Sequence, residues 1–310
     1  IDTIGKKMTV CQLYAKQIRH RGNVRYNTKN GRKRLMKLLE EDKLGGCPID
    51  SVKLSDAKEW AIRMKEKGIS YKTISNDKRS LKAAFYTAIQ DDCIRKNPFD
   101  FQLNTVIEDD TEPKVPLTPA QEESFLSFAQ NDKVYQKYYD ELIILLGTGL
   151  RISELCGLTD TDIDFENRII NVDHQLLRSA ETGYYIETPK TKSGIRQIPM
   201  SEKVYEAFNR VLKRRRGAKA VTIDGYSNFL FLNPDGYPKT ATNYDGMFRG
   251  LAKKYNKYHE EALPKVMTPH TLRHTFCTNM ANAGMNPKAL QYIMGHSNIT
   301  MTLNYYAHAT

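Results

Sequence analysis

The first third of the chain carries apolar side chains at the three- and four-residue spacing of amphipathic helices. Helices are predicted over residues 8–20, 30–42, 53–68 and 70–92. Ser55 stands where an N-cap would begin the third of these helices, and Gly68 stands where it would end. The stretch KNPFDF at 96–101 then breaks the pattern, because proline cannot continue a helix. Residues 1–107 are therefore predicted to form an all-helical domain.

A change of pattern separates this region from the rest of the chain. Residues 108–117 are acidic, contain two prolines and show no helical stripe, which is typical of a linker between domains. A new helix is predicted directly afterwards, with Thr118 as its N-cap, Pro119 at its first position and Gln121 completing a capping box. A second domain is thus expected over residues 118–310.

The second domain mixes helical and strand-like patterns. Short runs of β-forming residues occur as FENRIINV at 165–172, GYYIETPKT at 183–191 and GIRQIPM at 194–200. Because turns separate them, they indicate a small antiparallel sheet. Two late helices each begin with a capping residue and a proline, and they end at Gly284 and Gly295. The fold class predicted is mainly α with a small antiparallel β-sheet, divided into an all-helical domain and a mixed α+β domain.

The positive charge of the chain is concentrated at one end. The formal net charge is +11; residues 1–100 hold 23 Lys and Arg against 12 Asp and Glu, whereas the remainder holds 24 of each. A basic domain joined to a neutral one indicates binding to a polyanion. The alternative interpretation is that the surface charge only keeps the domain in solution. The Lys-Arg cluster at 213–216 is a further candidate. The predicted DNA contacts on the basic helices are Arg32, Lys33, Arg34, Lys72, Lys78 and Arg79.

Several function classes are excluded by motifs that the sequence lacks. Its five cysteines are scattered singly, which argues against a disulfide framework and a zinc site and favours a reducing cytosol. The sequence contains no P-loop and no convincing carboxylate cluster for a two-metal nuclease. No apolar run is long enough to span a membrane. We therefore expect chemistry without a metal or other cofactor, and no membrane partner.

The stretch HTLRH holds the first candidate chemistry. If this segment is helical, His270, Arg273 and His274 lie one turn apart on one side of the helix. The two histidines match the spacing of a metal-binding pair, but Thr271 stands where the H-E-x-x-H motif places its glutamate. Alternatively, an arginine fork and a histidine that can move a proton would suit a phosphate. A buried structural helix with a hydrogen-bonded histidine is the third interpretation.

Other candidates are weak when each is taken alone. Arg151 follows a glycine-rich break in GTGLRISEL and would start a helix, where an anion can bind, although it could simply pair with Glu154. His296 follows the helix end at Gly295 and could merely face solvent. A tyrosine can serve as a covalent nucleophile when arginines neutralise the phosphate, but the chain contains 18 tyrosines and composition singles out none.

Taken together, three segments resemble a known family. TGLRISEL, PHTLRHTFCTNMANAG and MGHSNITMTLNYYAH resemble the signature boxes of the tyrosine recombinases, or phage-type integrases. The residues of these segments are most similar to those of integrases from conjugative transposons of Gram-positive bacteria. The resemblance covers residues 118–310 strongly and residues 1–107 in general layout. It implies a core DNA-binding domain followed by a catalytic domain.

The resemblance also implies roles for individual residues. Arg151 and Arg273 would hold the scissile phosphate, His270 would assist proton transfer, and His296 would hydrogen-bond the phosphate. A tyrosine would then attack phosphorus, giving a 3′-phosphotyrosine link and a free 5′-hydroxyl. Because that link retains the energy of the phosphodiester bond, no high-energy cofactor is needed.

Two assignments within the resemblance stay open. The family uses a lysine on the turn of its small sheet as general acid; Lys190 matches the Lys-Thr wording, and Lys192 lies nearer the turn. We favour Lys190. The commonest spacing from His296 selects Tyr305 as the nucleophile, whereas the ending Thr-Leu-Asn-x-Tyr-x-His selects Tyr306, which we favour because that match uses more residues.

The expected function is site-specific DNA recombination that excises and integrates a mobile element. A type IB topoisomerase-like enzyme is the alternative with similar chemistry, and a DNA-binding regulator that has lost catalysis is the alternative of another class. The expected partners are double-stranded DNA at transposon ends, attachment and target sites, further copies of the chain as a dimer or tetramer on DNA, and an excision factor. The expected location is the bacterial cytoplasm, at the nucleoid. We expect the full protein to carry an additional N-terminal arm-binding domain and a C-terminal tail.

Overall fold

The computed structural model describes residues 7–189, 191–215, 217 and 221–306. The chain divides into two compact units, Ile1–Pro113 and Lys114–Thr310, and the division falls inside the predicted linker. Each unit has a hydrophobic core of its own. The predicted fold class is confirmed, because the first unit is helical and the second combines helices with short antiparallel strands.

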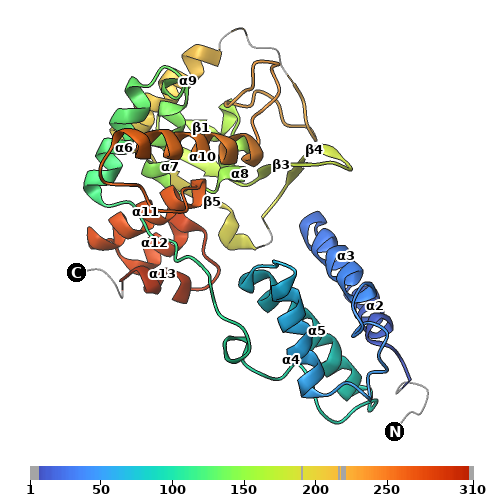
Figure 1. The fold of residues 1–310 in the computed structure, drawn as a ribbon. Helices are drawn as coiled ribbons and strands as arrows, with labels where there is room; N and C mark the ends of the chain where they lie inside the picture. The colour runs from blue at the N-terminus through green and yellow to red at the C-terminus, as the bar shows by residue number, and fades with distance from the viewer. Residues whose placement is uncertain (1–6, 190, 216, 218–220, 307–310) are drawn as a thin grey trace. The chain divides into compact units, whose positions relative to one another are not determined.

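Among the described residues, four helices form the first unit, and Figure 1 shows them as a bundle in blue to teal. Contacts join α2 to α3 and α5, and α4 to α5. In the core, Trp60 packs edge-on against Phe99 with 5.7 Å between ring centroids, and Phe85 lies 5.4 Å from the same ring. The KNPFDF segment thus contributes a core aromatic beyond the last helix. The helices are α2 (Val10–His20), α3 (Tyr26–Glu40), α4 (Leu54–Glu66) and α5 (Tyr71–Gln90), followed by the 3-10 turn η1 (Leu103–Thr105).

The starts of α3 and α4 differ from those predicted. Helix α3 begins at Tyr26, four residues earlier than the apolar stripe indicated. The predicted N-cap Ser55 is wrong, because α4 begins one residue before it with Lys53 as the N-cap residue. The carboxylate of Asp56 accepts a hydrogen bond from the Lys53 backbone N–H at 2.8 Å and so satisfies the helix start from within the first turn.

The second unit is built mainly from helices around one large core. Thr118, Pro119 and Gln121 begin its first helix with the predicted capping box. The helices before the strands are α6 (Pro119–Asn131), α7 (Tyr139–Thr148) and α8 (Ile152–Gly157), with the 3-10 turns η2 (Gln136–Tyr138) and η3 (Asp160–Asp162). Those after the strands are α9 (Glu202–Arg215), α10 (Ala241–Tyr258), α11 (Pro269–Asn282), α12 (Pro287–Met294) and α13 (Thr300–Tyr306).

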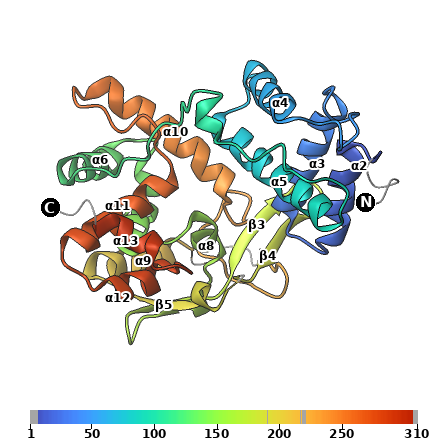
Figure 2. The ribbon, with the colours of Figure 1, turned by 90° about the horizontal axis from the view of Figure 1, so that it is seen from below.

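The strands form two small sheets instead of the single one expected. The first has the order β1-β2-β5, all antiparallel, and the second is the hairpin of β3 and β4. Figure 2 shows this hairpin extending beside α8, which contacts β3. The 3-10 turn η4 (Lys192–Gly194) leads into β5. The strands are β1 (Ile163–Asp164), β2 (Ile169–Val172), β3 (Gln175–Ser179), β4 (Gly183–Glu187) and β5 (Arg196–Pro199).

The last three helices pack on one another and bring the candidate residues together. Contacts join α11 to α7, α12 and α13, and α12 to α13 and β5. Helix α11 begins at Pro269 and α12 at Pro287, as predicted, and Asn286 caps α12 by accepting hydrogen bonds from two backbone N–H groups. Helix α12 stops at Gly295, which adopts the left-handed conformation (φ 62°) that favours glycine. The segment that follows therefore turns back toward α11.

Candidate active site

Arg151 is placed by a tight turn between two buried helices. Helix α7 ends at Thr148, and Gly149 adopts φ 65°. A Cβ atom at Gly149 would lie 2.5 Å from Phe276 Cδ1 and 2.9 Å from Met294 Sδ, so the close packing of α11 and α12 requires glycine here. The turn makes Arg151 the N-cap of α8. The predicted glycine-dependent break is confirmed.

Arg151 both pairs with Glu154 and stays open to an anion, which the sequence analysis gave as alternatives. Its guanidinium donates to Glu154 Oε1 at 2.8 Å, and its backbone N–H donates to Glu154 Oε2 at 2.8 Å. Its second guanidinium nitrogen donates to the carbonyl of Gly295 at 3.1 Å. The side chain remains 38% exposed. The pair with Glu154 thus orients a guanidinium that an anion can still approach.

Arg273 reaches the same loop from α11. It is buried and donates to the carbonyls of Gly149 and Met294, each at 2.5 Å. Arg151 donates to the following carbonyl in the chain, that of Gly295. The two guanidinium groups therefore bind consecutive carbonyls at the end of α12. Burial, followed by the charge of Arg151, lowers the pKa of Arg273 to about 9, so it remains a cation at neutral pH.

Two histidines lie in the field of these arginines. His296 is buried, and burial, followed by the charges of Arg273 and Arg151, lowers its pKa to about 4. Its Nδ1 lies 3.0 Å from the hydroxyl oxygen of Thr302. The ring of His270 is exposed at the start of α11, where desolvation and the charges of Lys114 and Arg273 lower its pKa, an effect that surrounding water weakens. Both rings are neutral at neutral pH and can accept a proton.

The two histidines of α11, His270 and His274, have different surroundings. His274 packs edge-on against Tyr305 of α13, with 4.9 Å between ring centroids. His270 instead lies close enough to Arg273, Arg151 and His296 to share their electrostatic field. This arrangement favours the phosphate-binding interpretation of HTLRH over the metal-binding one.

The two tyrosines on α13 have different surroundings. Tyr305 is half-buried, and burial raises its pKa while the positive charge of Arg273 opposes the rise. The hydroxyl of Tyr306 donates a hydrogen bond to the carbonyl of Met285, in the segment between α11 and α12. Of these two side chains, it is Tyr305 that lies within the electrostatic field of Arg273. Arg151, Arg273 and the side chains around them are called the arginine cluster below.

The lysine assignment is only partly covered by the structure. Lys190, the lysine we favour, lies outside the described residues. The alternate, Lys192, is exposed and begins η4, directly before β5. The turn itself is connected to Glu154 through Arg196. The carbonyl of Gly194 accepts a hydrogen bond from Arg196 at 3.2 Å, and Arg196 also donates to Glu154.

Three residues of the cluster were missed or undervalued at the sequence level. Glu154 entered only as a partner that would make Arg151 structural. Arg196 gave no signal, because a single arginine in a short strand is ordinarily exposed, yet it is buried here and binds Glu154. Thr302 lies three residues before Tyr305 on α13 and is completely buried beside His296. Its position one helical turn from a candidate tyrosine was the signal available.

The predicted DNA contacts differ in how accessible they are. Lys33, Lys72 and Arg79 are exposed, and Arg32 is half-buried. Arg34 donates to the buried carboxylate of Asp77 at 2.5 Å. Lys78 lies 4.5 Å from the ring centre of Phe101, and burial lowers the pKa of this lysine. Arg34 and Lys78 thus have structural contacts in addition to any contact with DNA.

One group of residues has the spacing of a metal site, but its histidine already contacts protein oxygens. The donor atoms of Asp162, Asp173 and His174 lie within 4.8 Å of one another. However, His174 Nδ1 lies 2.5 Å from Asp173 Oδ1 and its Nε2 lies 2.6 Å from the carbonyl of Gly157. Both ring nitrogens therefore already contact protein oxygens, which gives the histidine a structural role. The group instead ties the end of α8 to the strands.

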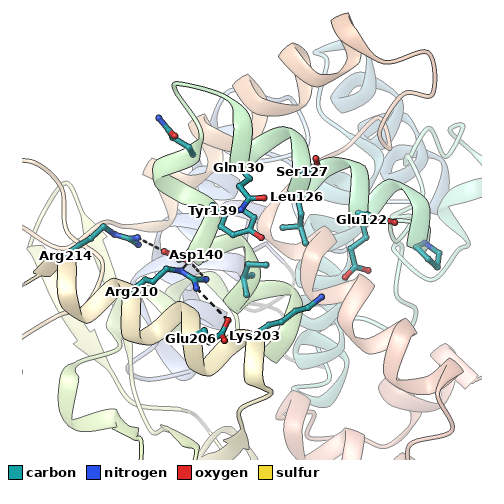
Figure 3. A pocket seen from close by; sticks show the side chains of 14 residues that line it. Glu122, Leu126, Ser127, Gln130, Tyr139, Asp140, Lys203, Glu206, Arg210 and Arg214 are labelled. Carbon is teal, nitrogen blue, oxygen red and sulfur yellow. Dashed lines mark hydrogen bonds and ion pairs between the residues drawn. The ribbon is translucent and has the colours of Figure 1, made fainter.

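A cavity of about 970 Å³ lies away from the arginine cluster, between α6, α7 and α9. Figure 3 shows Asp140 at its wall, paired with Arg210 and Arg214 of α9. Arg215 also has a structural contact, because it donates to the carbonyl of Phe229. Two arginines of the Lys-Arg cluster at 213–216 are thus engaged within the unit, and residue 216 lies outside the described residues. We assign the chemistry to the arginine cluster and not to this cavity, because the candidate catalytic residues do not line it.

Within the part of the chain that the structure describes, the helices lack the length and apolar character needed to cross a bilayer.

Comparison with known proteins identifies the family. The phage integrase family matches residues 116–310. A transposase from transposon Tn916 of Enterococcus faecalis is 69% identical over 310 residues, which is the whole of this chain and 76% of the relative. A transposase from transposon Tn1545 of Streptococcus pneumoniae shows the same identity and coverage. The chain belongs to the phage integrase family, the tyrosine recombinases.

Solved structures agree with this assignment. The Tn1549 transposon integrase, solved in complex with a circular intermediate DNA, superimposes with a TM-score of 0.94 at 78% identity, covering 98% of this chain and 96% of that one. A lambda integrase dimer bound to a core site shares the fold at a TM-score of 0.64 and 16% identity, covering 96% of this chain and 76% of that one. These relatives are transposases and integrases, and they give no support to the topoisomerase alternative.

Proposed function

We propose that this protein is a site-specific DNA recombinase that excises and integrates a mobile element by cutting and rejoining DNA. The observation that carries this function is the meeting of Arg151 and Arg273 on the consecutive carbonyls of Gly295 and Met294, with His296 directly after them. Two fixed cations and a neutral histidine suit a phosphodiester that gains negative charge in its transition state. The DNA complexes of the Tn1549 integrase and the transposon relatives support this function.

The reaction exchanges one phosphodiester for another. The tyrosine oxygen attacks phosphorus, the bond from phosphorus to the 5′ oxygen breaks, and a 3′-phosphotyrosine forms. The tyrosine proton passes to a neutral histidine, for which we assign His270. Arg151 and Arg273 neutralise the non-bridging oxygens, and His296 hydrogen-bonds to one of them. Rejoining reverses these steps with a 5′-hydroxyl of another strand.

We assign the nucleophile to Tyr305, which was our alternate, in place of Tyr306. Adjacent residues on a helix point about 100° apart, so only one of the two rings can face the phosphate. Tyr305 lies in the field of Arg273 and against His274, whereas the hydroxyl of Tyr306 is held by the carbonyl of Met285. An attack by Tyr306 would first have to break that hydrogen bond.

The spacing of substituted residues in the Tn1549 integrase supports the same choice. Its solved variants replace an arginine at position 225 of that protein by lysine and a tyrosine at position 379 by phenylalanine. These two positions are 154 residues apart. In the present chain 154 residues separate Arg151 from Tyr305, and 155 separate Arg151 from Tyr306.

A covalent trap tests the function and the nucleophile together. A DNA substrate nicked beside the cleavage site loses its short 5′-hydroxyl product, so the phosphotyrosine link accumulates. We expect wild type and Tyr306→Phe to give a covalent protein–DNA band and Tyr305→Phe to give none. A band lost only in Tyr306→Phe would restore Tyr306 as nucleophile, and the lack of any band with wild type on a substrate of this transposon class would contradict the function.

A lysine of the turn after β4 supplies the proton for the leaving 5′ oxygen, with Lys190 as our first choice and Lys192 as the alternate. A substrate with a bridging 5′ sulfur distinguishes them, because a thiolate leaves without a proton. The catalytic lysine is the one whose replacement by alanine slows cleavage of the oxygen substrate but not of the sulfur substrate. Equal slowing of both substrates by both variants would contradict the general-acid role.

We assign DNA grip to the basic helices of residues 1–107 and catalysis to residues 118–310. The charge surplus of the first hundred residues supports this division, together with exposed Lys33, Lys72 and Arg79. We propose double-stranded DNA and further copies of the chain, assembled as a dimer or tetramer on DNA, as partners, with an excision factor as an accessory. The proposed location is the bacterial cytoplasm, at the nucleoid.

A further inference from the structure

Among the described residues of the catalytic unit, Arg196 is the most deeply buried cation. Its side chain is 0% exposed, on the inward face of β5 next to buried Ile198. A buried guanidinium is costly unless its donors are satisfied. Here Nε donates to the carbonyl of Ile293 at 2.6 Å, and Nη1 donates to that of Gly194 at 3.2 Å. The two terminal nitrogens also grip both oxygens of Glu154, at 3.0 and 2.9 Å.

Glu154 links Arg196 to Arg151, the arginine proposed to bind the phosphate. The same two carboxylate oxygens accept the backbone N–H and the guanidinium of Arg151. Glu154 thus lies between two arginines, one fully buried and one open to an anion. If Arg196 were removed, the carboxylate would lose two of its four hydrogen bonds, and only Arg151 itself would hold it.

The remaining donors of Arg196 hold two other parts of the site. The carbonyl of Gly194 belongs to η4, the turn that begins with Lys192. The carbonyl of Ile293 lies three residues before His296. A Cβ atom at Gly295 would lie only 3.1 Å from Nη1 of Arg196, so the loop that carries His296 packs directly on this guanidinium. One side chain therefore fixes the lysine turn, Arg151 and the histidine loop relative to one another.

We propose that Arg196 is a positioning residue for DNA cleavage, which acts through Glu154 to fix Arg151 and aligns the lysine turn with the loop of His296. This inference rests on the proposed function of the arginine cluster. Arg196 does not touch the phosphate in this role. Its effect is on the geometry of groups that do, and a displacement of about 1 Å in such groups is enough to slow a reaction about a hundredfold.

Electrostatics separates this role from a purely structural one. Burial disfavours the charged form of Glu154, but Arg196, and after it Arg151, outweighs burial and lowers the pKa of the carboxyl to about 2. Glu154 faces Arg196 from β5, Arg151 from its own helix and Arg273 from α11, and the neutral rings of His270 and His296 share this field. Without Arg196 the carboxyl keeps its burial and loses its strongest partner, so its pKa rises.

The experiment compares Arg196→Met, Arg196→Lys, Glu154→Gln and the Arg196→Met/Glu154→Gln double variant with wild type. The covalent trap gives the cleavage rate from pH 5 to 9, fluorescence anisotropy gives the DNA affinity, and thermal unfolding gives Tm. Arg210→Met is the matched control, because Arg210 also pairs with a buried carboxylate, Asp140, but far from the cluster. Tyr305→Phe marks the baseline without chemistry.

We expect Arg196→Met to cleave about a hundredfold more slowly than wild type at neutral pH. We also expect its DNA affinity to stay within about threefold of wild type, because the phosphate grip of the other unit is intact. Its rate should fall further toward low pH, as Glu154 gains a proton. This fall should be additional to the one that the histidines cause in wild type, and it should be absent from the double variant, in which residue 154 no longer titrates. Arg210→Met should lower Tm and leave the pH profile of cleavage as in wild type.

Other results would overturn the proposal. A cleavage rate and pH profile of Arg196→Met equal to those of Arg210→Met would mean that Arg196 is only structural. If Arg196→Met does not fold, Arg196→Lys decides, since lysine keeps the charge but cannot hold Glu154 with two donors while reaching both carbonyls; wild-type cleavage by that variant would contradict the inference. A failure of wild type itself to form the covalent band would instead overturn the proposed function, and with it this role.

Discussion

The hydroxyl oxygen of Thr302 lies 3.0 Å from Nδ1 of His296, and both side chains are buried. Thr302 belongs to α13 and lies three residues before Tyr305, on the same side of that helix. The hydrogen bond thus joins a phosphate-binding candidate to the helix that carries the proposed nucleophile. It fixes the ring of His296 and the position of α13 at the same time.

Replacing Thr302 by valine tests this link, because valine keeps the shape and removes the hydroxyl. We expect Thr302→Val to lower the free energy of unfolding by about 1–2 kcal/mol, since the His296 nitrogen loses its buried partner. Cleavage in the covalent trap should fall by about tenfold or more, because both the histidine and the tyrosine helix lose their mutual support. Thr302→Ser keeps the hydroxyl and should retain most of the activity. Equal activity of the valine and serine variants would contradict the link.

The pKa of His296 makes stability depend on pH in a defined window. In the folded protein burial and the nearby arginines hold this pKa at about 4, whereas an unfolded histidine has a pKa of about 6.5. Between these values the unfolded chain binds more protons, so the stabilisation is complete above about pH 6.5 and is lost as the pH falls toward 4. Thermal unfolding should show a Tm that declines over this window, less steeply in His296→Gln. Identical pH slopes for the two proteins would contradict this assignment.

Much of the fold could be predicted from the sequence because its helix ends carry strong local signals. The capping box at Thr118 and the proline starts of α11 and α12 are set by residues adjacent in sequence, and each was found. The start of α4 was misplaced because Lys53 has no capping side chain of the usual kind; its N–H is satisfied by Asp56 instead. The division of the strands into two sheets depends on pairing between distant residues, which no local pattern specifies.

In the site, too, residues within short motifs could be predicted, whereas residues that act through contacts distant in sequence could not. Arg151, Arg273, His270 and His296 could be named in advance because they stand in recognisable motifs. Arg196 could not, because its importance lies in bonds to Glu154 and Ile293, which are 42 and 97 residues away. Our proposal of Tyr305 over Tyr306 also draws on the structure, since adjacent residues have almost the same sequence context but face different groups.

Two basic residues of the first unit should respond differently to the loss of their charge. Arg79 is exposed, so Arg79→Gln should weaken DNA binding and reduce the slope of log affinity against log salt by about 1, with little change in stability. Arg34 holds the buried Asp77, whose second oxygen has no hydrogen-bond partner in the described structure. Arg34→Gln should therefore also destabilise the protein, by about 1–3 kcal/mol. Anisotropy titrations at several salt concentrations and denaturant unfolding measure the two effects. An unchanged salt slope in Arg79→Gln would remove this residue from the proposed DNA-binding surface.

Gly149 provides a direct test of how the turn before Arg151 builds the site. An alanine there would have to adopt φ 65° and place its Cβ 2.5 Å from Phe276 and 2.9 Å from the sulfur of Met294. The left-handed conformation and the overpacking together should lower the free energy of unfolding by about 2–4 kcal/mol. Because Gly149 and Met294 also supply the carbonyls that hold Arg273, cleavage should fall more than the loss of folded protein explains.

The matched control for Gly149→Ala is Gly246→Ala, an exposed helical site on α10 where an added Cβ meets no atom within 4 Å. Alanine there should raise stability by about 0.5–1 kcal/mol, because glycine weakens a helix interior. Denaturant unfolding and the covalent trap, measured on both variants at a temperature where each is folded, separate stability from catalysis. If Gly149→Ala were destabilised and yet cleaved DNA at the wild-type rate, the carbonyl contacts of Arg273 would not be what positions the cation for the phosphate.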